Sequence, residues 1–135
     1  MIPKFKNDIN ADFTIVKQPN KTYKIDFETK TIRGYTDGLD AIKQAVYLIL
    51  NTERFINSIY SWNYGVELYD LIGCPAPLIF INIKQNVADA LLQDDRINSV
   101  EDFTFDRKKD AVSATFTVKT DIGNFEAEKV VLVNV

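Results

Sequence analysis

The sequence predicts an α+β domain: an antiparallel sheet packed on two main helices, in the order β-β-α-α-β-β-β. Three observations support this class. Apolar and polar residues alternate in Thr22–Phe27 and again in Val112–Lys119, as in half-buried strands. Residues 38–50 and 78–92 carry apolar side chains at helical spacing. A chain of 135 residues fits one domain.

Residues 1–21 predict an extended arm, and we expect the folded domain to span residues 22–135. The arm is mixed in character, and only Phe13–Val16 has the composition of a strand, which would pair with a partner. Residues 1–12 are polar and lack the apolar core of a signal peptide. We therefore expect no secretory leader here.

The domain begins with a predicted hairpin. Thr22–Phe27 places its apolar residues on one face, a turn follows at Glu28–Lys30, and Thr31–Arg33 returns as a short strand. Gly34 is expected to end this second strand.

A helix follows, with Asp37 as its N-cap and a start near Gly38. Its expected core positions recur at helical spacing, and they are Leu39, Ile42, Val46, Ile49 and Leu50. Val66–Leu71 is expected to form a short helix that stops at Gly73. Pro77 then suits the first turn of a helix that runs to Leu92, with a core stripe of Phe80, Ile83, Val87 and Leu91.

Three strands close the predicted domain. The first lies near Ser99–Asp106, the second places Val112, Ala114, Phe116 and Val118 on one face, and the third covers Phe125–Val135. Its end, Val130–Val133, is apolar on both faces, so an open sheet edge there would invite association. Either this strand lies centrally and is simply buried, which the sequence slightly favours, or a partner adds a strand beside it.

The composition excludes several kinds of site. The chain has no histidine, which removes imidazole bases and His-containing metal sites. Cys74 is the only cysteine, so no internal disulfide forms, and it is expected to be a small buried residue. Lys and Arg are scattered in a chain of net charge −3, which argues against nucleic-acid binding. Apolar stretches are too short to span a bilayer. We expect no cofactor and no metal.

The remaining polar and aromatic candidates allow more than one interpretation. Glu67 and Asp70 would share a helix face and are a weak carboxylate pair for glycoside cleavage. Glu53 beside Arg54 is either a surface ion pair or a structural element. An aromatic group fits a hydrophobic cluster over the helix ends, a protein-binding surface or sugar stacking, and consists of Phe55, Tyr60, Trp62 and Tyr64.

The middle of the chain resembles the XkdS-like branch of the gene-25-like baseplate wedge proteins of contractile phage tails, prophages and tailocins. The resemblance rests on the run from Ile32 to Phe55, on Ile59-Tyr60-Ser61, on Asn63–Leu68 and on Leu71-Ile72-Gly73. Five residues match the family pattern one by one, namely Thr52, Glu53, Arg54, Tyr64 and Gly65. The sequence departs from many members at Thr52 and Asn63, where those members have Gly and Pro.

The resemblance implies a structural, non-enzymatic subunit of a tail baseplate, in a virion or tailocin particle assembled in the bacterial cytoplasm. It implies that the Glu53–Arg54 element docks on larger wedge proteins. It also implies that the terminal strand, with Val130, Val131, Leu132 and Val133, accepts arms from the first ring of sheath subunits. Implied partners are wedge proteins and sheath subunits, with central hub or tube proteins as further candidates, at six copies per particle.

Two alternatives stay open at this point. The first is a lysozyme-like enzyme that cleaves peptidoglycan with a carboxylate pair, since some family members once carried that label. The second is an interaction domain unrelated to phage tails.

Overall fold

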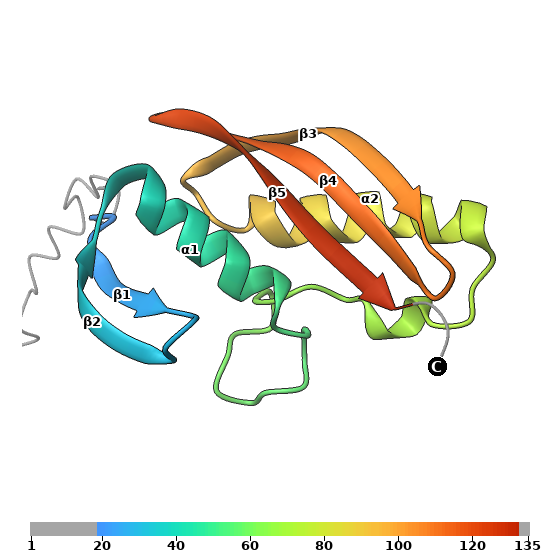
Figure 1. Ribbon diagram of the computed structural model, residues 1–135, viewed down its shortest axis with the longest axis horizontal. Helices are drawn as coiled ribbons and strands as arrows, with labels where there is room; N and C mark the ends of the chain where they lie inside the picture. The colour runs from blue at the N-terminus through green and yellow to red at the C-terminus, as the bar shows by residue number, and fades with distance from the viewer. Residues whose placement is uncertain (1–18, 133–135) are drawn as a thin grey trace, which may run out of the picture.

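The computed structural model describes residues 19–132. Its elements are β1 (Thr22–Asp26), β2 (Thr31–Thr36), α1 (Gly38–Leu50), the 3-10 turn η1 (Tyr69–Leu71), α2 (Ala76–Leu92), β3 (Ile97–Arg107), β4 (Ala111–Thr120) and β5 (Gly123–Leu132) (Figure 1). This order confirms the predicted α+β class. Most of the predicted arm, including Phe13–Val16, lies outside the described residues, as does Val133.

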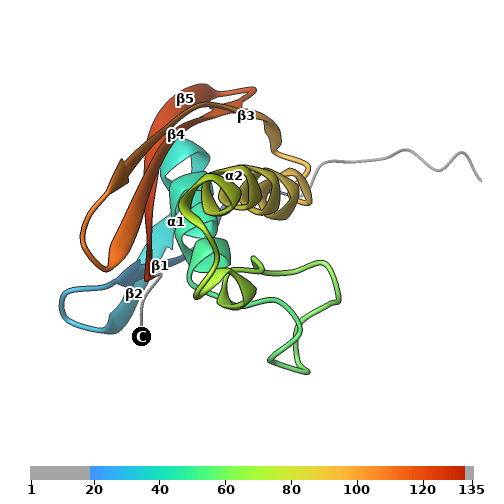
Figure 2. The same cartoon turned by 90° about the vertical axis from the view of Figure 1, so that its right-hand side faces the viewer.

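The strands form two antiparallel sheets. β1 and β2 make a hairpin, and the other sheet has the order β3-β4-β5. Both helices lie on the same face of the three-stranded sheet, and the opposite face is free of them (Figures 1 and 2). The domain is therefore two-layered, with its core between this sheet and the helices.

The central strand β4 confirms the alternation predicted for it. The side chains of Val112, Ala114, Phe116 and Val118 are all 0% exposed. They belong to one cluster with α1 residues Ile42 and Val46 and with α2 residues Ile83, Val87 and Leu91. Burial of these side chains contributes hydrophobic free energy that holds sheet and helices together.

The predicted start of α1 is also confirmed. The Asp37 side chain accepts a hydrogen bond from the Gly38 backbone N–H at 2.7 Å, and Asp40 lies in the first turn. The helix ends at Leu50, with Asn51 as its C-cap.

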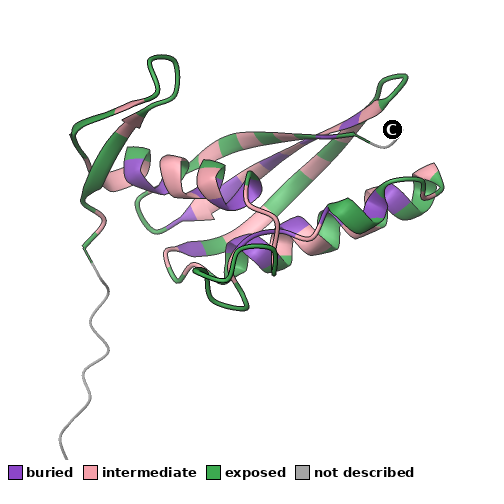
Figure 3. Ribbon diagram, turned by 90° about the horizontal axis from the view of Figure 1, so that it is seen from below, coloured by how far each residue is buried: buried purple, intermediate pink, exposed green. Residues whose placement is uncertain are grey.

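Two details of the hairpin differ from the prediction. β2 continues through Gly34 to Thr36, because Gly34 has a φ of +67° at a β-bulge that shifts the register between Tyr23 and Ile25. The hairpin is also largely exposed rather than half-buried (Figure 3), with Tyr23 at 62%. It is a two-stranded unit held to α1 by local contacts, such as the bond from the Ile25 N–H to Gln44 Oε1 at 3.0 Å.

The segment before α2 is less helical than predicted. Only Tyr69–Leu71 forms a 3-10 turn, because Val66 instead pairs with Glu53 in a parallel bridge. Cys74 is partly exposed rather than buried, and its thiol lies 3.5 Å from the Asp70 carbonyl oxygen.

Simple burial of the last strand is wrong. β5 lies at an edge of its sheet. Val131 is 4% exposed, whereas Val130 is 52% and Leu132 is 64% exposed. Of the two apolar faces of this strand, the face with Val131 is therefore buried, and the face with Val130 and Leu132 is open to solvent.

Candidate functional site

The five residues that match the family pattern come together at the base of one loop. The chain leaves α1 through Thr52–Arg54, forms a loop over residues 55–63, and returns through Tyr64 and Gly65. Val66 N–H donates to the Thr52 carbonyl oxygen at 3.0 Å, and Arg54 N–H donates to the Val66 carbonyl oxygen at 3.2 Å. We call these paired segments, residues 52–54 and 64–66, the loop stem.

Gly65 allows the two sides of the stem to approach closely. Its φ is +93°, and a Cβ atom built on it would lie 2.6 Å from the Thr52 carbonyl oxygen and 3.1 Å from the Arg54 nitrogen. Both neighbours are backbone atoms, which cannot move aside cheaply. No other residue type fits this position without opening the stem.

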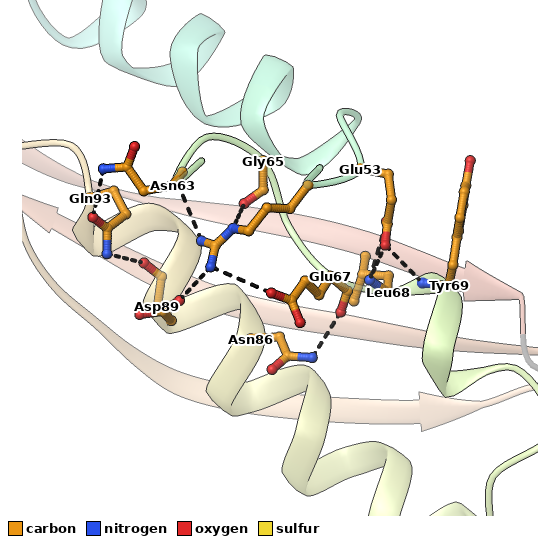
Figure 4. A network of polar contacts seen from close by, with 10 residues as sticks. Glu53, Asn63, Gly65, Glu67, Leu68, Tyr69, Asn86, Asp89 and Gln93 are labelled. Atoms are coloured by element: carbon orange, nitrogen blue, oxygen red, sulfur yellow. Dashed lines mark hydrogen bonds and ion pairs between the residues drawn. The ribbon is translucent and has the colours of Figure 1, made fainter. Parts of the chain in front are cut away.

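The Glu53 carboxylate binds backbone donors within the chain. It accepts hydrogen bonds from Leu68 N–H at 3.0 Å and from Tyr69 N–H at 3.2 Å, at the start of η1 (Figure 4). Glu53 thereby fixes the segment that connects the stem to α2.

The Arg54 side chain is only 11% exposed and ties the stem to α2. Its Nε donates to the Gly65 carbonyl oxygen at 3.2 Å, and its Nη2 donates to the Asn63 carbonyl oxygen at 3.4 Å. Its Nη1 lies 2.9 Å from Asp89 Oδ2 on α2 and 3.7 Å from Glu67 Oε1 (Figure 4). The guanidinium thus contacts the segment that returns from the loop, at Asn63, Gly65 and Glu67, and it also contacts α2.

Sequence reasoning missed the partners on α2. Asp89 binds Arg54, and the Asn86 amide donates to the Glu67 carbonyl oxygen at 2.8 Å. Both residues lie among the polar positions of an amphipathic helix, and no pattern in the sequence separates them from ordinary solvent-facing side chains.

The loop itself presents apolar side chains to solvent. Ile59 is 85% and Trp62 is 86% exposed, and Phe55 and Ile56 are also exposed. Figure 2 shows this loop projecting away from the three-stranded sheet. Tyr60 stacks on Tyr64 at 4.6 Å between ring centroids, and only Tyr64 packs against the core. This exposure favours the protein-binding interpretation of the aromatic group over a cluster that covers the helix ends.

The two edge strands of the three-stranded sheet, β3 and β5, differ in how regular their pairing with β4 is. β5 pairs with β4 at ten consecutive positions without a register shift. β3 pairs with β4 through two register shifts, and Asp102 within it has a φ of +57°. Bulges of this kind bend the strand and interrupt the regular row of backbone groups, so another strand pairs poorly with that edge. A regular edge remains able to pair.

The hydrogen-bonding direction along β5 follows from the turns. Ala111 exchanges both backbone hydrogen bonds with Lys108 across the β3–β4 turn, so Val112 directs its backbone groups to Val131. By alternation, the odd-numbered residues of β5 bond to β4. The even-numbered residues direct their N–H and C=O groups to the free edge, and they include Glu126, Glu128, Val130 and Leu132.

A groove runs along β5 beside α1 and η1. Its lining is partly apolar, with Val46, Tyr47, Leu50, Phe125, Ala127 and Val131, and it contains Lys43 and Lys129. Lys129 Nζ lies 3.4 Å from Asn51 Oδ1 at the C-terminal end of α1. Burial lowers the pKa of the Lys129 ammonium, against the opposing effect of the Glu53 carboxylate.

No helix in the described range of residues has the length and apolar character that crossing a membrane requires. Between residues 19 and 132, no group of three or more acidic and cysteine side chains is placed to hold a metal ion. Two features of the described surface stand out: the apolar loop on its stem, and the free edge of β5 with its groove.

Comparison with known proteins agrees with the resemblance noted from the sequence. A family model described as contractile injection system sheath initiator matches residues 18–123. The chain is 39% identical over 128 residues to the phage-like element PBSX protein XkdS of Bacillus subtilis (strain 168). That alignment covers 92% of this chain and 90% of the relative.

Proposed function

The chain belongs to the contractile injection system sheath initiator family, and from this premise we propose that it is a baseplate wedge subunit whose β5 edge accepts a strand from the first sheath subunits. Membership establishes a structural role in a contractile tail of the phage type. The proposal adds the location in the baseplate, the two contact surfaces and the mode of sheath contact.

One observation carries the strand-addition part of the proposal. β5 presents a regular edge without bulges, next to a groove, while β3 at the other edge is bulged twice. A row of unpaired backbone groups on a flat edge is the template that an extended partner segment needs. Such a segment would also form hydrogen bonds with the backbone N–H and C=O groups that the even-numbered residues of β5 direct to the free edge.

The apolar loop is our candidate for docking on the wedge proteins. Glu53 and Arg54, which the family resemblance associates with docking, direct their charged groups into the chain. We therefore assign them an indirect part: they hold the stem, and the stem presents Ile59 and Trp62 to the partner. Exposed tryptophan and isoleucine on a fixed loop are suited to filling a pocket in another protein.

Replacing Val130 by proline in the producing bacterium tests strand addition. The Val130 N–H points to the free edge, so proline there removes a donor and places its ring at the edge without breaking pairing with β4. We expect baseplates that contain the subunit but carry no sheath, as seen by electron microscopy and mass spectrometry of purified particles. Val130→Thr, which keeps the N–H, is the matched control and should give normal tails.

Normal sheath on Val130→Pro baseplates would contradict strand addition at β5. Absence of the variant subunit from the baseplate, with the free protein still folded by circular dichroism, would mean that this edge serves docking instead.

A further inference from the structure

Resting on the proposed strand addition, we infer the chemistry of the strand that β5 accepts. The geometry points to an extended segment with basic side chains beside Glu126 and Glu128. The same segment has aliphatic side chains beside Val130 and Leu132, and apolar side chains on its groove-facing side.

The even-numbered side chains of β5 point away from the helices, and we call them the outward row. Their charge determines which side chains of an added strand are favoured beside them. Glu126 and Glu128 are exposed on the face of the sheet away from the helices. In the described part of the chain neither carboxylate forms an ion pair, and Glu128 accepts a hydrogen bond only from the Ser113 hydroxyl. Lys119, on the same face, is already paired with Glu101 at 2.6 Å. Side chains directly opposite on adjacent strands lie close enough for opposite charges to attract, so an added strand meets two uncompensated acids.

The same row is not acidic throughout. Val130 and Leu132 continue it and are more than half exposed. A segment that covers the whole edge therefore meets acids at one end of the row and aliphatic side chains at the other. This asymmetry specifies register, because a slip by two residues places a basic side chain beside an aliphatic one.

The groove-facing row of the added strand lies over a different surface. It packs beside Phe125, Ala127 and Val131 and toward Tyr47 and Leu50 of α1. Apolar side chains fit this lining. Lys129 in the same groove has only the Asn51 amide oxygen at 3.4 Å as a hydrogen-bond acceptor among the described residues. A segment with a carboxylate or amide oxygen at that position would satisfy its ammonium group.

A second copy of this chain is a poor occupant. Two β5 edges pairing with one another would bring four glutamates into one small region, and like charges on adjacent strands repel. The acids therefore discourage self-association of the free subunit and select a basic partner, which is a common way of protecting an edge strand.

Two labelled peptides of the length of β5 test this inference on the full chain. Both carry valine and threonine in the inward row; the outward row is Lys, Lys, Val, Leu in one and Glu, Glu, Val, Leu in the other. We expect the lysine peptide to bind at least about tenfold more tightly at low salt by fluorescence anisotropy, with the difference shrinking at high salt. On a Glu126→Lys, Glu128→Lys variant the preference should reverse.

The matched control is Asp106→Lys with Asp110→Lys, which changes net charge equally but on β3 and the β3–β4 turn, across β4 from the aliphatic end of β5 and not beside Glu126 and Glu128. The natural preference should persist in it. Reversal in the control as well would show a general charge effect and overturn the inference. Equal binding of both peptides by the natural chain would also overturn it, while leaving strand addition intact. Binding of neither peptide would contradict strand addition at β5 and the inference with it.

Discussion

The guanidinium of Arg54 lies 2.9 Å from the carboxylate of Asp89, which joins the segment after α1 to the last turn of α2. The same guanidinium bonds to the carbonyl oxygens of Gly65 and Asn63. A single side chain therefore fixes how the loop stem sits on the helical layer. The charged groups of Glu53 and Arg54 therefore bind within this chain, which is why we propose that they support the loop rather than contact a partner themselves.

Replacing Arg54 by alanine should destabilise the domain by about 1–3 kcal/mol, because a side chain that is only 11% exposed is lost and the buried Gly65 loses the donor to its carbonyl oxygen. Arg54→Lys should recover only part of the loss, since one ammonium cannot match the forked geometry of the guanidinium. Urea unfolding monitored by circular dichroism measures both. An Arg54→Ala variant as stable as the natural chain would show that the contacts contribute nothing to the fold.

Gly65→Ala should cost about 3 kcal/mol, because it adds backbone strain and an overlap with the Thr52 carbonyl oxygen. Gly73→Ala is the matched control: its φ is also positive, at +85°, but a Cβ atom there meets nothing within 4 Å. The control should lose only about 1 kcal/mol. Thermal unfolding measures both losses of stability. Equal losses in the two variants would show that the close approach of the two sides of the stem is not what makes Gly65→Ala destabilising.

Exchanging both Ile59 and Trp62 for serine should leave stability within about 0.5 kcal/mol of the natural value, because both side chains are exposed. The variant should nevertheless be missing from purified baseplates. Ile122→Ser, which removes an exposed isoleucine from the β4–β5 turn, is the control and should be incorporated normally. Normal incorporation of the double variant would refute docking through the loop.

Lys129 gives a pH dependence of known sign. Burial lowers the pKa of its ammonium below the ordinary value of 10.5. Between the lowered pKa and 10.5 the unfolded chain binds more protons, so the free energy of unfolding contributed by this residue rises with pH. Lys129→Met should therefore be more stable than the natural chain at neutral pH, by a margin that narrows as the pH rises through that window. A margin that widens would show that the charged amine is favoured by the fold.

Much of the fold could be predicted because its pattern is local. The period-two run from Val112 to Val118 gave one face of β4 correctly, and Asp37 gave the start of α1. Gly34 was misassigned because a glycine in a strand marks either an end or a bulge, and only the cross-strand register distinguishes the two.

The candidate site could be predicted only in part. The family pattern singled out Thr52–Arg54 and Tyr64–Gly65, but their pairing is visible only in the structure. The inward direction of Arg54 depends on Asp89, which lies 35 residues away on another element. The position of β5 at a sheet edge could not be predicted either. Val130–Leu132 is apolar on both faces of the strand, which also fits a central strand, and the order of strands depends on tertiary packing.

Amide hydrogen exchange of β5 is the most direct measurement of strand addition. In the free chain, the amides of Glu126, Glu128 and Val130 should exchange rapidly, while those of Ala127, Lys129 and Val131 are protected by pairing with β4. In assembled tails, exchanged as particles and then dissociated for analysis, this alternation should disappear because the outward amides become protected as well. Outward amides that exchange as fast in assembled tails as in the free chain would contradict the account.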